Sequence, residues 1–155
     1  MFLDSAAGVG FNGLAGLTVG NGSRAFIDGS GGANEFVGNG TGVLVFRGSE
    51  AVFSGPNSVH DNTGVGLEAD ENSAVLLADI TVQNNAQGGV SALRTSTVGF
   101  DTVGAGGNAL SGNGGANVSC DSTALIFGNL TGITGINCTR IERSIGPPRP
   151  GRVRE

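Results

Sequence analysis

Acidic side chains gather in one short stretch near the middle of the 155-residue chain. Glu68, Asp70 and Glu71 lie close together there, and Asp61 and Asp79 are nearby in the sequence. Carboxylate oxygens are the hard ligands that Ca²⁺ prefers, at about six oxygens per ion. The stretch has no alternating Asp loop of the EF-hand type. Glu68, Asp70 and Glu71 are therefore the candidate calcium ligands, although we expect a charged, solvated turn and no bound cofactor.

Two arginines could act together with these acids. The chain has no lysine, and Arg47 and Arg94 are the only arginines in its central part. A base beside a carboxylate can abstract a proton, and a pair of carboxylates can hydrolyse a glycoside. The candidate catalytic residues are Arg47, Glu68, Asp70 and Arg94. An ordinary salt bridge explains the same pattern and would contribute about 0–1 kcal/mol if exposed.

Other residue types that carry chemistry are scarce. His60 is the single histidine, and it precedes Asp61. Adjacent residues of a strand point to opposite faces, so we expect no His–Asp pair. One histidine also does not favour a zinc site. The chain lacks Trp and Tyr, on which sugar-binding surfaces usually rely.

A repeat of roughly two dozen residues must position these side chains. Its first part alternates apolar residues, in copies at 16–19, 42–45, 64–67, 89–92, 117–120 and 135–138. Its second part reads Ser-x-apolar-x-apolar and begins at Ser23, Ser49, Ser73, Ser96 and Ser122. Its third part reads apolar-x-x-Asn and ends at Asn39, Asn62, Asn85 and Asn113, with Val9-x-x-Asn12 as a partial earlier copy. Alternation predicts a short strand for each part.

Three strands in a constant order predict a solenoid whose coils stack strand on strand. Two packed antiparallel sheets would also give short strands, but they need no such fixed order. A helical repeat lacks support because no 3.6-residue period is present. Equivalent residues of successive coils should therefore lie one above another in columns.

The pattern resembles the right-handed parallel β-helix of the pectate-lyase-like superfamily, over roughly Leu17 to Ile141. The resemblance implies an all-β, right-handed parallel β-helix of five to six coils with three short strands per coil. It also implies that the asparagine column forms a ladder of side-chain amides, although Asn is a good turn former in its own right. Lyases of the superfamily cluster acids around calcium beside a catalytic Arg or Lys, and its glycosidases pair carboxylates.

One outward column is apolar where a solvated face would be polar. In the second strand, the positions between the core residues are Phe26, Val52, Leu76, Gly99 and Leu125. An apolar stripe of this kind predicts a covering partner, for which another copy of the chain is the first candidate. A folded-back segment of the same chain is the alternative. Phe26, Val52, Leu76 and Leu125 are the predicted interface residues.

The two cysteines occupy the same position of successive copies, Asn-Val-Ser-Cys120 and Ile-Asn-Cys138. If they lie on adjacent rungs, their Cα separation fits the disulfide range of about 4.4–6.8 Å. We predict a bridge between Cys120 and Cys138, and buried free thiols are the alternative. A bridge would indicate an extracytoplasmic or secreted protein. The chain itself shows no signal peptide.

The repeat stops after Ile141, which gives two predicted regions. Residues 1–141 form the β-helix domain, and residues 142–155 form a Pro/Arg-rich cap or tail, because its prolines prevent ladder pairing. The net charge of −5 indicates no nucleic-acid partner. No apolar run is long enough to cross a membrane.

These observations favour a non-catalytic structural or interaction module. We expect a β-solenoid that forms the C-terminal part of an extracytoplasmic surface or fibre-like protein and self-associates as a homo-oligomer through the apolar stripe. The alternative is a carbohydrate-active protein, a lyase, epimerase or hydrolase that acts on or binds an acidic polysaccharide. The short repeat domain, the missing lysine and the absence of a paired motif favour the first.

Overall fold

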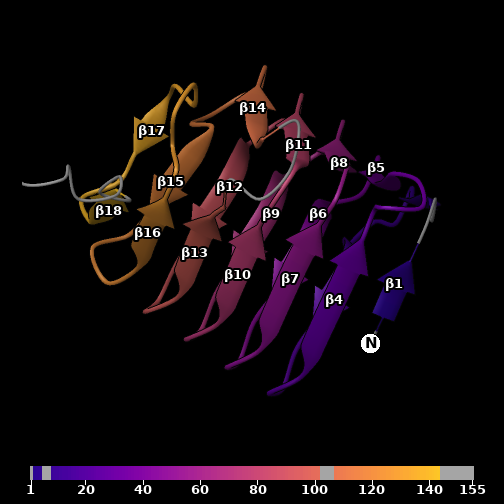
Figure 1. Ribbon diagram of the computed structural model, residues 1–155, viewed down its shortest axis with the longest axis horizontal. Coiled ribbons are helices and arrows are strands. Elements are labelled where there is room, and N and C mark those ends of the chain that lie inside the picture. Colours follow the sequence, from indigo (N-terminus) through magenta and orange to yellow (C-terminus); the bar gives the residue numbers. More distant parts are fainter. Residues whose placement is uncertain (1, 5–7, 102–106, 144–155) are drawn as a thin grey trace, which may run out of the picture.

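The chain folds into three parallel β-sheets that stack as a β-solenoid of about five turns. The computed structural model describes residues 2–4, 8–101 and 107–143. Within these residues the first five turns visit the three sheets in the same order, the last turn has strands in only two of them, and equivalent strands lie side by side along the long axis (Figure 1). The predicted all-β solenoid with three short strands per coil is confirmed.

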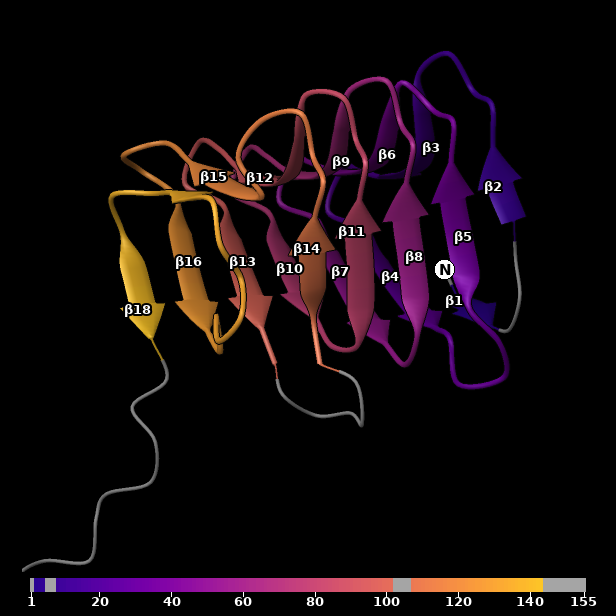
Figure 2. The ribbon, with the colours of Figure 1, turned by 90° about the horizontal axis from the view of Figure 1, so that it is seen from above.

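Every pairing between neighbouring strands in the three sheets is parallel (Figure 2). Sheet A contains β1 (Phe2–Asp4), β4 (Arg24–Asp28), β7 (Glu50–Ser54), β10 (Ala74–Leu77), β13 (Thr97–Phe100), β16 (Leu125–Gly128) and β18 (Ile141–Arg143). Sheet B contains β2 (Gly8–Gly10), β5 (Asn34–Val37), β8 (Asn57–His60), β11 (Ile80–Gln83) and β14 (Ala109–Ser111). Sheet C contains β3 (Ala15–Val19), β6 (Thr41–Val45), β9 (Val65–Ala69), β12 (Gly88–Ala92), β15 (Val118–Cys120) and β17 (Ile136–Asn137).

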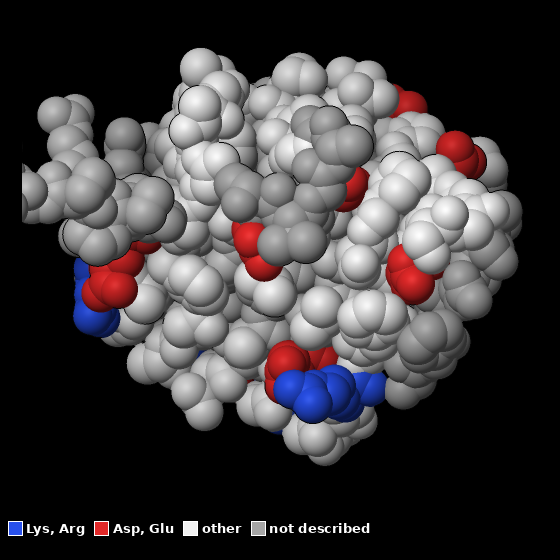
Figure 3. Space-filling model, in the orientation of Figure 1, with Lys and Arg blue, Asp and Glu red and all other residues white. Residues whose placement is uncertain are grey.

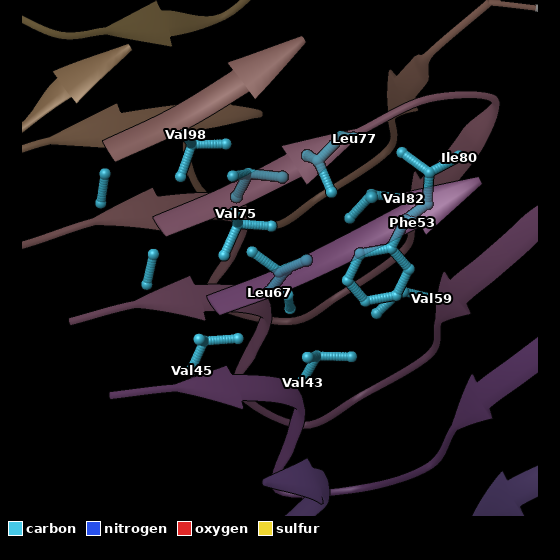
Figure 4. Close-up of a cluster of buried hydrophobic side chains, with 14 of the residues drawn as sticks. Val43, Val45, Phe53, Val59, Leu67, Val75, Leu77, Ile80, Val82 and Val98 are labelled. Atoms are coloured by element: carbon cyan, nitrogen blue, oxygen red, sulfur yellow. The ribbon is translucent and has the colours of Figure 1, made fainter. Parts of the chain in front are cut away.

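The core lies inside the stack, where the inward residues of all three sheets meet. Leu67 from sheet C, Leu77 from sheet A and Val82 from sheet B are all completely buried, and they point into the same interior (Figure 4). The rings of Phe36 and Phe53 meet edge to face, with centroids 6.3 Å apart. Because side chains point alternately to the two faces of each short strand, alternate residues face the core and the ones between them face outward.

The predicted asparagine ladder is confirmed at the corner between sheets B and C. Asn62 donates from Nδ2 to Asn85 Oδ1 at 2.8 Å, and Asn85 donates in the same way to Asn113 Oδ1 at 3.0 Å. Asn12 joins the same column through its amide, which lies 3.1 Å from Asn39 Oδ1. Each buried amide also reaches a strand carbonyl, as Asn62 does with Phe36 O. The ladder thus pairs backbone groups that the strands leave unpaired at the corner.

A column of glycines makes room for this ladder. A Cβ on Gly66 would lie 2.6 Å from Asn85 Nδ2 and 2.7 Å from Val82 Cγ1, which is too close for either atom. Gly16 and Gly42 face the ladder in the same way. Glycine is therefore required at this inner corner because the amide occupies the space of a side chain.

A second ladder runs through the serines at the start of the sheet A strands. Ser49 N–H donates to Ser73 Oγ at 3.2 Å, and Ser73 N–H donates to Ser96 Oγ at 3.1 Å. All three serines are buried. The sequence shows the regular serine spacing, but we predicted no hydrogen-bonded serine column from it.

Two copies of the repeat were aligned incorrectly from the sequence, each by two residues. Leu67 and Ala69, and not Val65 and Leu67, pair with the core positions Val43 and Val45. Val65 is accordingly only partly buried. Because side chains in a strand alternate with a period of two, a slip of two residues preserves the pattern of inward and outward faces, and alternation alone cannot detect it.

The second misalignment concerns the last coil of sheet A. Ile126 pairs with Val98, so Ala124 and not Ser122 takes the position of the ladder serines. Phe127 pairs with Gly99 and continues the outward column. Leu125 pairs with Thr97 instead, and it lies in the neighbouring row of the same face.

The solenoid continues slightly beyond the predicted boundary. In β18, Ile141 and Glu142 pair with Ile126 and Phe127 of β16. The remaining Pro/Arg-rich segment, 144–155, lies outside the described residues. None of the described residues belongs to a helix that is long and apolar enough to cross a membrane.

Candidate functional site

Apart from Glu68, which lies on β9, the candidate catalytic and calcium-binding residues lie in stacked turns between sheets C and A. Each turn has two residues with positive φ: Arg47 and Gly48, Glu71 and Asn72, and Arg94 and Thr95. The buried serine of the serine ladder follows each pair. Because the turns share one conformation, their side chains stack in columns on the outside of the corner.

The charges of this column pair from one coil to the next. Arg47 Nε lies 3.5 Å from Glu71 Oε2, and Arg94 Nη2 lies 3.6 Å from Glu71 Oε1. Arg47 Nη1 also donates to Asn21 Oδ1 at 3.3 Å. The structure therefore brings Arg47, Glu71 and Arg94 together, in the manner of a cross-coil salt bridge.

Asp70 is the buried member of the cluster. Its side chain is 8% exposed, and Arg94 holds it with two donors of one guanidinium edge, Nε at 2.7 Å from Oδ1 and Nη2 on Oδ2. Its backbone aligns with Phe46 and Leu93, a position that the sequence alignment had given to Glu68. The hydrogen bond to Asp70 raises the pKa of Arg94. The positive charge of Arg94 is thus already matched within the protein.

Glu68 lies outside this pairing. It points outward from β9, between Leu44 and Ser91 of the neighbouring strands, and is partly buried. Burial raises the pKa of its carboxyl group, the negative charge of Asp70 raises it further, and Arg94 lowers it. The protonated form of Glu68 is therefore favoured by the fold, and its contribution to stability is lost as the pH rises through its folded pKa.

Asp121 extends the cluster by one coil, and the sequence did not identify it. It accepts hydrogen bonds from the backbone N–H groups of Arg94, Thr123 and Ala124 and from the Thr123 hydroxyl. These donors, with the Arg94 N–H as the largest contribution, lower its pKa to about 2. Its contribution to stability is present above the ordinary pKa and is lost as the pH falls toward 2. Asp121 acts as a turn cap.

Thr95→Gly is expected to raise the free energy of unfolding by about 1 kcal/mol, because a β-branched residue is strained at the φ of 65° that Thr95 adopts. Gly22 and Gly48 occupy the equivalent position in other coils. Chemical denaturation measures the gain, which corresponds to about 2–4 °C in Tm. Thr97→Gly is the matched control within β13, where glycine weakens the strand. An equal loss of stability in Thr95→Gly and Thr97→Gly would contradict the claim that the backbone is strained at Thr95.

His60 and Asp61 are in contact, contrary to the sequence-based expectation. His60 Nδ1 lies 2.8 Å from Asp61 Oδ2. Asp61 has a φ of 53°, so the strand ends at His60 and the alternation of faces ends with it. No described serine hydroxyl is hydrogen-bonded to His60, so the pair lacks the nucleophile of a triad.

Cys120 and Cys138 are neighbours, but the predicted disulfide is not formed in the structure. Both cysteines are free thiols and partly buried. The pairing of Ser119 with Asn137 places them side by side on β15 and the residue after β17. Burial, together with a hydrogen bond to Cys120, raises the pKa of Cys138. The raised pKa keeps the Cys138 thiol protonated at neutral pH.

The outer face of sheet A carries an unbroken apolar row. Its members, called the sheet A row below, are Phe26, Val52, Leu76, Gly99 and Phe127. A Cβ on Gly99 would overlap the Phe127 ring and would lie 3.0 Å from Leu76 Cδ1, so the neighbouring side chains cover this glycine. Phe127 is 37% exposed. The predicted stripe is thus present, with Phe127 in place of Leu125.

Polar side chains border this row at its N-terminal end. Arg24 and Glu50 form an exposed salt bridge on one side, with the two atoms 2.6 Å apart. Asp28 and Ser54 pair on the other side. Uncharged residues cover most of the face that sheet A turns toward the viewer, and charged residues form separate spots (Figure 3).

No family model, curated protein or solved structure matches the chain. The charged cluster has partners for both of its arginines, and within the described ranges no group of three or more His, Cys, Asp or Glu side chains is arranged to hold a metal ion. Its chemistry is that of a structural ion-pair column.

Proposed function

We propose that the protein is a non-catalytic interaction module, a rigid β-solenoid that self-associates through the sheet A row. The proposal rests on the sheet A row, because the described residues form no comparable apolar row on the outer faces of sheets B and C. The outward residues of sheet B include Glu35, Ser58 and Thr81, and those of sheet C include Thr18 and Glu68.

The physical argument rests on the location of apolar surface. An apolar centre with a polar border is the usual anatomy of a protein interface. The row follows the long axis of the solenoid, so a second copy can present the same row along its own length and form a closed, symmetric contact. The stacked backbone makes the row straight and stiff, which lowers the ordering cost of association.

Leu76→Arg is expected to weaken self-association at least about 30-fold, because it places a charge at the centre of the row. The side chain points outward, so the stability of the monomer should change by less than about 1 kcal/mol. Light scattering across a concentration series measures association, and thermal unfolding measures stability.

Thr81→Arg is the matched control, because Thr81 points outward from β11 on sheet B. It should leave association unchanged. A monomeric mass for the unmodified protein at every concentration would contradict the proposal, and so would an equal effect of the two substitutions.

An extracytoplasmic setting and membership of the pectate-lyase-like superfamily remain parts of the proposal. The stack of three parallel sheets and the asparagine ladder support the likeness to that superfamily. The adjacent thiols of Cys120 and Cys138 support an oxidising setting, since a disulfide needs only their oxidation in place. Mass analysis of protein from its native source, alkylated without reduction, tests this setting by the presence or absence of the bridge.

Action on an acidic polysaccharide is the alternative, and one observation favours it. Glu68 is partly buried with a raised pKa beside Asp70, as a general acid would be. We expect no depolymerisation of pectate or alginate, with or without calcium, because Arg94 is already held by Asp70 and Glu71. Depolymerisation that Glu68→Ala abolishes would reverse this choice.

A further inference from the structure

Two borders of outward residues flank the sheet A row on the same strands. The border on the N-terminal side of the strands consists of Arg24, Glu50, Ala74, Thr97 and Leu125. The border on the C-terminal side includes Asp28, Ser54, Ala78 and Asp101, which occupy equivalent positions in successive coils. Because side chains alternate between the two faces of a strand, residues two positions away from the row share its outer face. We call these two sets the N-side border and the C-side border.

β4 carries opposite charges on the two borders. The Arg24 side chain is 73% exposed, and its Nη2 donates to Glu50 Oε1 at 2.6 Å. Asp28 lies on the other side of Phe26, and its Oδ1 accepts from Ser30 N–H at 2.9 Å. A guanidinium group has five N–H donors, so Arg24 can bind a second carboxylate while it keeps Glu50. The coil of β4 therefore presents a cation and an anion on either side of the apolar row.

Two copies joined through the sheet A row can run in the same direction or in opposite directions. A two-fold axis parallel to the solenoid gives the same direction, and it places the N-side border of each copy over the C-side border of the other. Because this rotation involves no shift along the axis, every coil faces the same coil of the second copy. A two-fold axis along the strands reverses the second copy and brings like borders together.

The charged residues of the borders fit the same direction. In that arrangement Arg24 faces Asp28 of the second copy, and the two-fold axis repeats this contact. Glu50 then faces Ser54, so the described residues of the two borders bring no like charges together. In the opposite direction, with the rows overlapping along their full length, β4 faces β16 and Arg24 lies over the apolar Leu125. That arrangement offers the guanidinium no carboxylate of the second copy.

The apolar row itself does not decide between the two directions. The Phe127 ring and Leu76 cover Gly99, so the row has no gap that a side chain of the second copy must fill. Glu142 continues the column after Phe127 and would face Glu142 of the second copy in the same direction. This like-charge contact lies at the exposed end of the stack, where interactions between charges are weak. The choice of direction therefore rests on the borders.

We propose that the two copies run in the same direction, coil against coil, and that Arg24 and Asp28 fix this direction by pairing across the interface. The inference rests on the self-association proposed above and adds the residues that orient it. Complementary charges at the border of an interface mainly fix its register and exclude wrong arrangements, whereas the buried centre supplies most of the affinity. Arg24 and Asp28 therefore orient the pair, and Leu76 belongs to its centre.

Reversal of the two charges tests this pairing. Arg24→Asp places a carboxylate opposite Asp28 of the second copy, and Asp28→Arg places a guanidinium opposite Arg24. Each variant alone should associate at least about ten-fold more weakly than the unmodified chain, because like charges then meet twice. In a mixed pair of the two variants both contacts join opposite charges, so an equimolar mixture should regain the affinity of the unmodified chain to within about three-fold. Light scattering across a concentration series, at low ionic strength, measures each association.

Glu35→Arg is the matched control, because it makes the same change of charge as Asp28→Arg on the outer face of sheet B. It should leave the affinity within about two-fold, and thermal unfolding checks that every variant folds. Suppose that the unmodified chain associates, but the mixture stays as weak as the single variants or either charge reversal leaves association unchanged. The direction is then overturned and self-association stands. If the unmodified chain is monomeric at every concentration, self-association and its direction fail together.

Discussion

Asn62→Ala should lower the free energy of unfolding by about 2–6 kcal/mol. The side chain accepts from Asn39 N–H at 2.8 Å and donates to Phe36 O at 3.1 Å, in a place where Asn62 is 2% exposed. Alanine removes the side-chain partner of both backbone groups. Each buried group left without a partner costs about 1–3 kcal/mol.

Urea denaturation followed by circular dichroism measures this loss. Asn137→Ala is the matched control, because Asn137 is exposed on the outer side of β17, and its loss should stay within about 0.5 kcal/mol. A stability of Asn62→Ala within about 0.5 kcal/mol of the unmodified protein would show that the ladder contributes no stability and that asparagine serves there as a turn former.

Phe53→Ala should cost about 3–5 kcal/mol, the typical loss for a fully buried phenylalanine. Phe53 is 0% exposed and packs edge to face against Phe36 in the interior of the solenoid. The loss combines the transfer of the ring to water with a cavity that stacked strands cannot close, because their spacing is set by backbone hydrogen bonds.

Phe127→Ala gives the matched comparison on the outer side of the same sheet. Phe127 is 37% exposed, so its removal should cost the monomer less than about 1 kcal/mol and should weaken association instead. Equal losses of stability for the two phenylalanines would contradict the assignment of inner and outer faces.

The solenoid could be predicted because one pattern governs every coil. Alternation assigns the inward residues of each strand, and the resemblance to the pectate-lyase-like superfamily implied the asparagine ladder, in which an amide both donates and accepts along the stack. The two-residue errors at Val65 and Ser122 could not be detected from alternation, because the predicted and the observed alignments both satisfy it. The spacing from the ladder carried the missing signal: the core residue follows Asn12, Asn85 and Asn113 by five positions and Asn39 by four, whereas Val65 follows Asn62 by only three.

The details of the candidate sites depend on turn geometry, which alternation does not describe. Positive φ at Asp61 brings its carboxylate to His60, although alternation predicts opposite faces. Stacked left-handed turns bring Arg94 to Asp70 and Glu71, whereas the misaligned register placed Glu68 in that column.

The most direct test of self-association is an intermolecular distance measured across the sheet A row. In a background with Cys120→Ser and Cys138→Ser, a spin label is attached at Ala74→Cys, beside the row, or at Thr81→Cys on sheet B. Dilution with unlabelled protein identifies the intermolecular signal. The proposal predicts a short intermolecular distance for the label at 74 and none for the label at 81; no intermolecular signal at 74, or the same signal at both positions, would contradict it.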